Sequence, residues 1–163
     1  VYVESEIENI IGVEDGVGSD EAVHSYSVQQ LASVAASTGV DMLAPQLGTA
    51  HGLYSAAPEL LFERARQVRE ASGRHVVLHG GTGLSADEFR AFIAAGVSKI
   101  NISTQCKISY MKAMLAFLKQ AEASGEWDPP SMFRAAADAV TDSIAELPPL
   151  FGSSGRAREV LHQ

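Results

Sequence analysis

The chain has 163 residues, with 12 Lys and Arg against 20 Asp and Glu, and a formal net charge of −8 with neutral histidines. Its 46% hydrophobic residues are typical of a globular protein and exclude a disordered or fibrous one. The acidic balance argues against nucleic acid or an anionic membrane surface as the main partner, since both attract Lys and Arg. A single cysteine, Cys106, allows no internal disulfide, and neither a membrane span nor a signal peptide is recognisable. We therefore predict a soluble, cytoplasmic protein.

Strand and helix signals alternate along the chain. Val1 to Val3 reads as a strand already under way, so that the sequence is consistent with one piece of a longer polypeptide. Ser27 and Gly39 predict the start and stop of a helix over 28–38, and Ser85 with Glu88 forms the capping box of another that runs to residue 96. Further helices are predicted over 58–70, 104–121 and 130–146, further strands over 40–44, 76–78 and 97–102, and an extended tail over 147–163.

Apolar strands that alternate with helices of this length indicate an α/β fold with a parallel sheet. We count four βα units, which make half of a (β/α)₈ barrel or the whole of a small open sheet. In both architectures the functional loops follow the carboxyl ends of the strands.

Two histidines follow neighbouring strands at this rim. His51 and His79 are 28 residues apart, which is one βα unit, and each is followed by glycine. Imidazoles on a rigid rim are common zinc ligands. The alternative is that each is a hydrogen-bonded loop histidine without a metal.

Two loops after consecutive strands have the character of a phosphate cradle. Glycines in the run 80–83 let backbone amides approach an anion, and Thr82 adds a hydroxyl donor. The stretch 101–104 leads directly into a helix N-terminus, which attracts phosphate. Each glycine run by itself is more often a plain turn.

The opening segment is rich in carboxylates. In a continuous strand, Glu4, Glu6 and Glu8 would share one face. Such a face is either exposed to solvent or supplies a carboxylate beside a metal, with a general acid or base near it.

Six motifs in order resemble the class II, zinc-dependent ketose-bisphosphate aldolases, a family that includes fructose- and tagatose-bisphosphate aldolases. Glu8 and Ile11 stand where that family usually has glycine. The resemblance covers most of the chain and continues into its closing stretch, 151–157. The six motifs occupy residues 4–6, 12–16, 38–44, 48–52, 78–83 and 99–104.

The resemblance implies a (β/α)₈ barrel of which residues 1–163 form the C-terminal half. It implies that His51 and His79 bind zinc, that Glu6 binds metal in an alternative position, and that Glu14 transfers a proton. The backbone around His51 and Thr82 is expected to hold a monovalent cation, and members are typically homodimers or larger. By the same resemblance, the dihydroxyacetone-phosphate part of the substrate is held by Gly52, Gly80, Gly81, Thr82, Asn101, Ser103 and Thr104.

These features predict reversible, zinc-dependent aldol cleavage of a ketose bisphosphate to dihydroxyacetone phosphate and an aldehyde phosphate. Such a lyase belongs to carbohydrate metabolism and glycolysis. The family's acid/base Asp and first zinc histidine have no counterpart in these residues, so we expect this chain by itself to be an incomplete aldolase. The rival hypothesis is a non-catalytic half-barrel that binds a phosphate or sugar phosphate, or pairs with another chain.

Overall fold

The computed structural model describes residues 1–157 apart from 9, 11, 15–16, 20–24 and 55–56. The chain divides into two compact units, residues 1–102 and residues 103–163. Among the described helices, none combines the length and the hydropathy needed to cross a bilayer.

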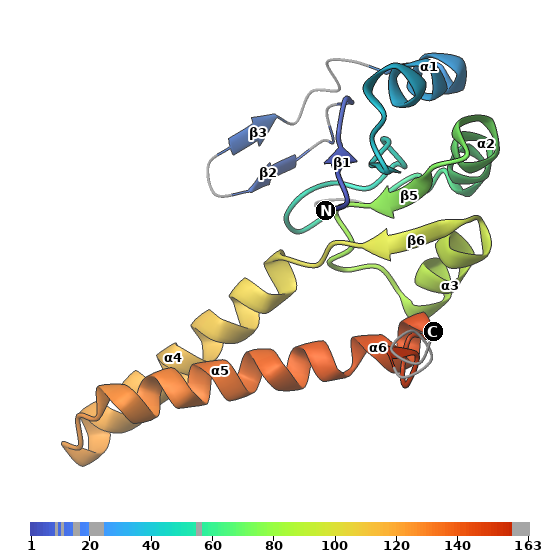
Figure 1. Ribbon diagram of the computed structural model, residues 1–163. Helices are drawn as coiled ribbons and strands as arrows, with labels where there is room; N and C mark the ends of the chain where they lie inside the picture. Colours follow the sequence, from blue (N-terminus) through green and yellow to red (C-terminus); the bar gives the residue numbers. More distant parts are fainter. Residues whose placement is uncertain (9, 11, 15–16, 20–24, 55–56, 158–163) are drawn as a thin grey trace. The chain divides into compact units, whose positions relative to one another are not determined.

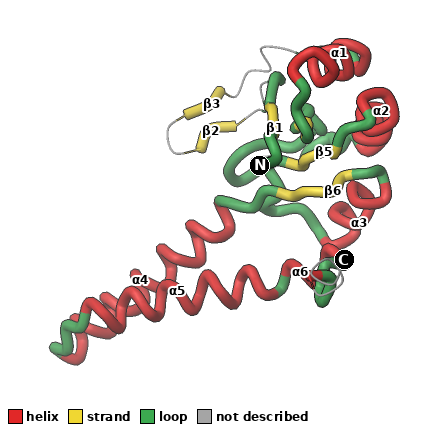
Figure 2. The backbone as a smooth tube through the Cα atoms, in the orientation of Figure 1, coloured by secondary structure: helices red, strands yellow, loops and turns green. Residues whose placement is uncertain are grey.

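The first unit contains a parallel sheet with its four strands in chain order. Its strands are β1 (Glu4–Ser5), β4 (Met42–Leu43), β5 (His75–Leu78) and β6 (Val97–Ile100), paired as β1-β4-β5-β6. The connecting helices α1 (Val28–Thr38), α2 (Phe62–Ser72) and α3 (Ala86–Ala94) lie on one face of this sheet (Figures 1 and 2). Parallel strands that follow one another in chain order are the arrangement of successive strands in a (β/α)₈ barrel. The α/β fold with a parallel sheet is therefore confirmed, and it is consistent with part of such a barrel.

The core of this unit is the central strand β5 and the helices over it. Val76, Val77 and Leu78 are fully buried, as the absence of polar alternation in this strand predicted. Phe92 of α3 is also fully buried and packs against Phe62 of α2, with ring centroids 4.5 Å apart. This packing fixes the strand whose carboxyl end carries His79.

Helix α1 begins and ends where its capping residues predicted. The Ser27 hydroxyl accepts a hydrogen bond from the Gln30 amide and completes a capping box, and Gly39 closes the helix in the left-handed conformation. Helix α2 starts at Phe62, later than the expected start at Pro58. The Leu61 amide donates to the Leu47 carbonyl at 2.9 Å, which holds this segment beside the loop after β4 instead of in a helical turn.

The opening segment differs from the sequence expectation. The strand β1 covers only Glu4–Ser5, so a single strand face carrying Glu4, Glu6 and Glu8 is wrong. An antiparallel hairpin, which the sequence did not indicate to us, follows: β2 (Gly12–Glu14) pairs with β3 (Val17–Ser19).

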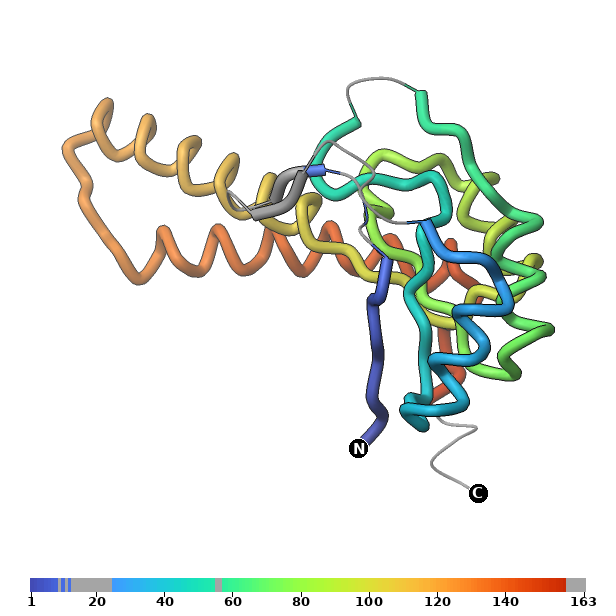
Figure 3. The backbone as a smooth tube through the Cα atoms, turned by 90° about the horizontal axis from the view of Figure 1, so that it is seen from above, coloured from blue at the N-terminus to red at the C-terminus, as the bar shows by residue number. Residues whose placement is uncertain are grey.

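The second unit is a helical hairpin. Helices α4 (Thr104–Ser124) and α5 (Pro129–Ala145) lie side by side in opposite directions (Figure 3), and Gly125 ends α4 in the left-handed conformation. A short helix, α6 (Leu147–Phe151), replaces the start of the predicted extended tail. Its two prolines occupy the first turn, where a backbone N–H would have no partner within the helix, and Gly152 ends the helix. Residues 158–163 of that tail lie outside the described residues.

Candidate active site

Three potential metal ligands meet at the carboxyl ends of neighbouring strands. Glu6 follows β1, His51 follows β4 and His79 follows β5. One donor atom from each side chain lies within 4.8 Å of the donor atoms of the other two. The two imidazole ring centroids are 5.7 Å apart. Two imidazoles and a carboxylate at this spacing suit a zinc ion, whose nitrogen and oxygen ligands bind at about 2.0–2.2 Å.

The imidazole of His79 is held from both sides. Its Nδ1 lies 2.8 Å from Glu6 Oε2, and its Nε2 lies 2.7 Å from Glu4 Oε1 and 2.9 Å from Asn101 Nδ2. Burial by itself lowers the pKa of His79, but the hydrogen bonds and charges of the two carboxylates outweigh it and leave the pKa above its ordinary value. The orientation of this ring is therefore fixed by its partners.

Glu4, one of the three carboxylates considered from the sequence for a place beside a metal, belongs to this cluster, and so does Lys99, for which the sequence suggested no role. Lys99 Nζ lies 2.6 Å from Glu4 Oε2 and 2.5 Å from Asn101 Oδ1. Burial raises the pKa of Glu4, and the hydrogen bonds from Lys99 and His79 more than reverse that effect, so the pKa is lowered. The available signal was spacing: Lys99 precedes Asn101 by two residues, which places both on one side of an extended segment.

Glycines allow the site loops to approach one another closely. Gly80 has φ +67°, and a Cβ there would overlap the backbone carbonyl of Ala50. Gly12 has φ +117°, and a Cβ there would overlap the carbonyl of His51. The loops that carry the two histidines are thus packed backbone against backbone, which only glycine permits at these positions.

The expected phosphate-binding loop is packed closely against its surroundings. Thr82 is 6% exposed, and Gly81 is buried with Ile102 against it. The Tyr54 hydroxyl donates to the Gly80 carbonyl at 2.6 Å. Burial is the main cause that raises the pKa of Tyr54, so this hydroxyl stays protonated and remains a donor. Gly52, another expected substrate residue, has φ +86° in the loop after His51.

The remaining predicted residues belong to different parts of the chain. Asn101 lies beside His79, as above, but Ser103 and Thr104 belong to the second unit, where they begin α4. Glu14 ends β2, and its side chain lies outside the described part of the structure.

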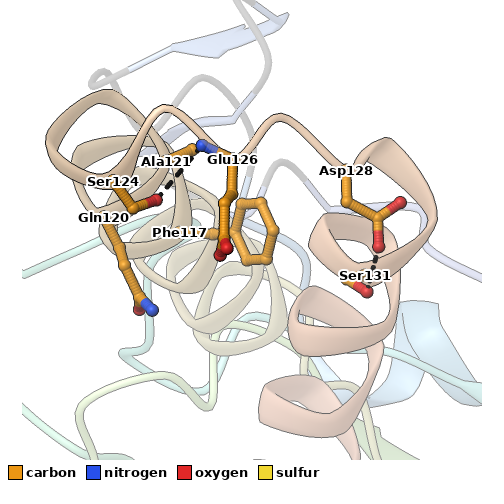
Figure 4. Close-up of a pocket in the computed structure, with 7 residues that line it drawn as sticks. All are labelled: Phe117, Gln120, Ala121, Ser124, Glu126, Asp128 and Ser131. Atoms are coloured by element: carbon orange, nitrogen blue, oxygen red, sulfur yellow. Dashed lines mark hydrogen bonds between the residues drawn. The ribbon is translucent and has the colours of Figure 1, made fainter.

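A separate hollow in the second unit has a volume of about 190 Å³ (Figure 4). It lies at the turn between α4 and α5 and is lined by residues that include Phe117, Glu126 and Asp128. Ser131 donates to Asp128 at 2.5 Å, and the Glu126 amide donates to Ser124 at 3.2 Å. These bonds stabilise the turn itself, and none of the candidate site residues lines this hollow.

Together, the fold and the site define a parallel α/β protein with a candidate metal centre at the carboxyl ends of its strands. The chain belongs to the family described as "Fructose-bisphosphate aldolase class-II", whose model it matches over residues 1–156. This membership confirms the resemblance inferred from the six motifs.

Individual relatives agree with that assignment. The chain is 33% identical over 159 residues to a fructose-bisphosphate aldolase of Geobacillus stearothermophilus, covering 98% of this chain and 54% of the relative. In structure it is similar to the YdjI aldolase of Escherichia coli K12, with TM-score 0.74, 30% identity and coverage of 96% and 52% of the two chains. A protein of Coccidioides immitis, provisionally named a fructose-1,6-biphosphate aldolase, gives TM-score 0.81, 27% identity and coverage of 97% and 54%. The chain thus spans about half the length of the relatives it matches.

Proposed function

We propose that this chain supplies the C-terminal half of a zinc-dependent aldolase that reversibly cleaves a ketose bisphosphate to dihydroxyacetone phosphate and an aldehyde phosphate. One observation carries the proposal: Glu6, His51 and His79 converge at adjacent strand ends in a member of the class II aldolase family. The activity belongs to the whole protein, because the chain spans about half the length of its relatives.

The metal would be held by the two imidazoles, with the Glu6 carboxylate as the alternative ligand. Bound there, zinc supplies a Lewis acid that stabilises negative charge on the substrate's ketone oxygen while the carbon–carbon bond breaks. Glu4 orients the His79 ring by accepting the proton of its Nε2 atom, in the way that outer partners commonly orient metal-binding histidines.

The other residues bind substrate and move a proton. The backbone amides of Gly80 and Gly81 hold the phosphate end of the ketone fragment, since glycine lets backbone N–H groups approach an anion closely, and Asn101 contributes its side-chain amide to the same fragment. Glu14 transfers the proton. We extend the same binding role to Gly52, Thr82, Ser103 and Thr104, and we place a monovalent cation at the backbone around His51 and Thr82.

The setting of this activity follows from the same assignment. A sugar-phosphate lyase of this kind acts in carbohydrate metabolism, including glycolysis, in the cytoplasm. We propose that the protein is a homodimer or a larger homo-oligomer.

The role of the metal is tested by removing zinc from the protein and then restoring it. The whole protein is dialysed against a chelator, its zinc content is measured, and release of triose phosphate from fructose and tagatose bisphosphates is assayed before and after zinc is restored. We expect turnover to disappear with the zinc and to return with it. Turnover that persists in protein shown to be metal-free would contradict the proposal.

His51→Ala tests the ligand assignment against a matched control. We expect it to abolish both stoichiometric zinc binding and turnover. His75→Ala is the control, because His75 lies exposed at the other end of β5, with its Nδ1 3.1 Å from Ser98 Oγ. Turnover retained by His51→Ala, or lost equally in His75→Ala, would overturn the role of His51.

A further inference from the structure

A buried carboxylate joins three separate segments next to the candidate metal site. The Glu8 side chain is 0% exposed. Its Oε1 accepts the Tyr26 amide at 2.9 Å and lies 2.6 Å from Arg64 Nη2, while its Oε2 accepts the Gln46 amide at 2.7 Å. Glu8 thus contacts the segment before α1, the loop after β4, and helix α2.

Arg64 also donates hydrogen bonds to the backbone of the two residues that Glu8 binds, Gln46 and Tyr26. Its Nε donates to the Gln46 carbonyl at 3.0 Å, and its Nη2 donates to the Tyr26 carbonyl at 2.8 Å. Burying an ion pair is unfavourable unless its geometry and hydrogen bonds compensate for lost hydration. Here the five bonds satisfy the pair and fix both backbone segments in direction as well as distance.

The segments joined in this way carry two of the three candidate ligands. Glu8 is two residues after Glu6, and Gln46 is five residues before His51. The Gln46 side chain also accepts the Gly48 amide at 2.7 Å, which continues the fixed path toward His51. On the other side of Glu8, Gly12 packs directly on the His51 backbone.

We propose that Glu8 and Arg64 are positioning residues that set the separation of Glu6 and His51 and thereby the metal affinity of the site. Neither is placed among the ligands. The inference rests on the proposed metal site. Apolar contacts are not directional and let packed segments shift against one another. Charge-assisted bonds of 2.6–2.9 Å fix the position of the loop as accurately as a metal centre requires.

The test compares zinc affinity in Glu8→Gln, Arg64→Met and Arg64→Lys with the unaltered whole protein. Glu63→Gln and Arg66→Met are the controls, because these residues form an exposed pair on the same helix, 2.9 Å apart. Affinity is measured by competition with a chromogenic chelator, the cobalt(II) form is compared by its visible spectrum, and folding is checked by circular dichroism. We expect about a 10- to 100-fold loss of affinity in Glu8→Gln and Arg64→Met, an altered cobalt spectrum, partial recovery in Arg64→Lys, and no change in the controls.

Affinity within threefold of the unaltered protein in folded Glu8→Gln and Arg64→Met would overturn the inference. Failure of all three variants to fold would overturn it as well, because a role in stability alone would then account for the cluster. If the unaltered protein binds no zinc, the proposed function fails. The positioning role of Glu8 is then tested separately by NMR, from the ¹⁵N and ¹H chemical shifts of the His79 ring in the metal-free protein. A change of those signals in Glu8→Gln supports it, and unchanged signals overturn it.

Discussion

At the scale of single residues, the site depends on glycine at positions where any side chain would collide with the neighbouring backbone. Gly80 follows His79 directly and leaves its place beside the Ala50 carbonyl empty of any side chain. That contact sets how closely the loops carrying His51 and His79 approach. The glycine run was predicted from the sequence to suit an anion, and its packing role became visible only in three dimensions.

Gly80→Ala is expected to destabilise the protein more than Gly39→Ala. Both glycines have positive φ, +67° and +71°, so both variants lose about 1 kcal/mol from backbone strain. Only the alanine at 80 also meets a backbone carbonyl, whereas nothing lies within 4 Å of a Cβ at 39. Urea unfolding should therefore give a free-energy loss for Gly80→Ala at least about twice that for Gly39→Ala. Equal losses would show that the loops separate freely.

Among the elements, α3 shows how a sequence signal becomes structure. Ser85 accepts the Glu88 amide at 3.3 Å, and Glu88 Oε2 accepts the Ser85 amide at 2.6 Å and its hydroxyl at 2.8 Å. The bonds from Ser85 lower the pKa of Glu88 below its ordinary 4.5. The folded state therefore favours the charged carboxylate, and this stabilisation is present above pH 4.5 and is lost as the pH falls through the folded pKa.

Glu88→Gln should consequently lower stability by about 0.3–1 kcal/mol at pH 7, and by less at pH 3. Asp87→Asn is the control, because Asp87 lies in the same first turn, and its one ion pair within the described part of the chain is with the exposed Arg90, at 2.7 Å. Thermal unfolding at both pH values measures the two differences. A Glu88→Gln effect that is the same at pH 3 and pH 7 would contradict the assignment of the cap to the carboxylate.

Elements with local signals were predictable, and elements fixed by distant partners were not. Helices α1 and α3 were predicted from their capping residues, which are Ser27 and Gly39 for α1 and Ser85 and Glu88 for α3. These signals could be recognised because a helix cap depends on residues at or next to the helix ends. The start of α2 depends on the carbonyl of Leu47, far away in sequence, and was misplaced. The missed β2–β3 hairpin and the short helix α6 do not follow this division, because the hairpin pairs only residues 12–14 with residues 17–19, and the prolines and Gly152 of α6 are local signals that were overlooked.

The same distinction between local signals and distant partners applies to the residues of the site. His51 and His79 were singled out because each follows an apolar segment and precedes glycine, and the sheet brings both beside Glu6. Glu8 was expected to share a face with Glu6, but its donors at Tyr26, Gln46 and Arg64 draw it into a buried cluster. No local pattern records those three partners.

At the scale of the whole molecule, the chain corresponds to about half of its relatives. Within the described residues, β1 and β6 are the outer strands of the sheet and have one strand partner each. Large apolar side chains are also exposed on the second unit, including Met111, Leu115 and Phe133 at 63%, 54% and 54%. Open strand edges and exposed apolar side chains favour association.

The 163-residue chain expressed alone should therefore self-associate and show no aldolase turnover, whereas the whole protein should be a defined homo-oligomer with turnover. Light scattering after size exclusion and the triose-phosphate assay measure both properties. A monodisperse, active isolated chain would show that these residues suffice for catalysis and would contradict the half-barrel assignment.

The central claim is that Glu6, His51 and His79 form a zinc site, and anomalous diffraction at the zinc absorption edge tests it most directly. Crystals of the whole protein grown with zinc should show an anomalous peak at about 2.0–2.2 Å from a ring nitrogen of His51 and of His79. Full zinc occupancy elsewhere in the protein, with no peak between these two rings, would contradict the account.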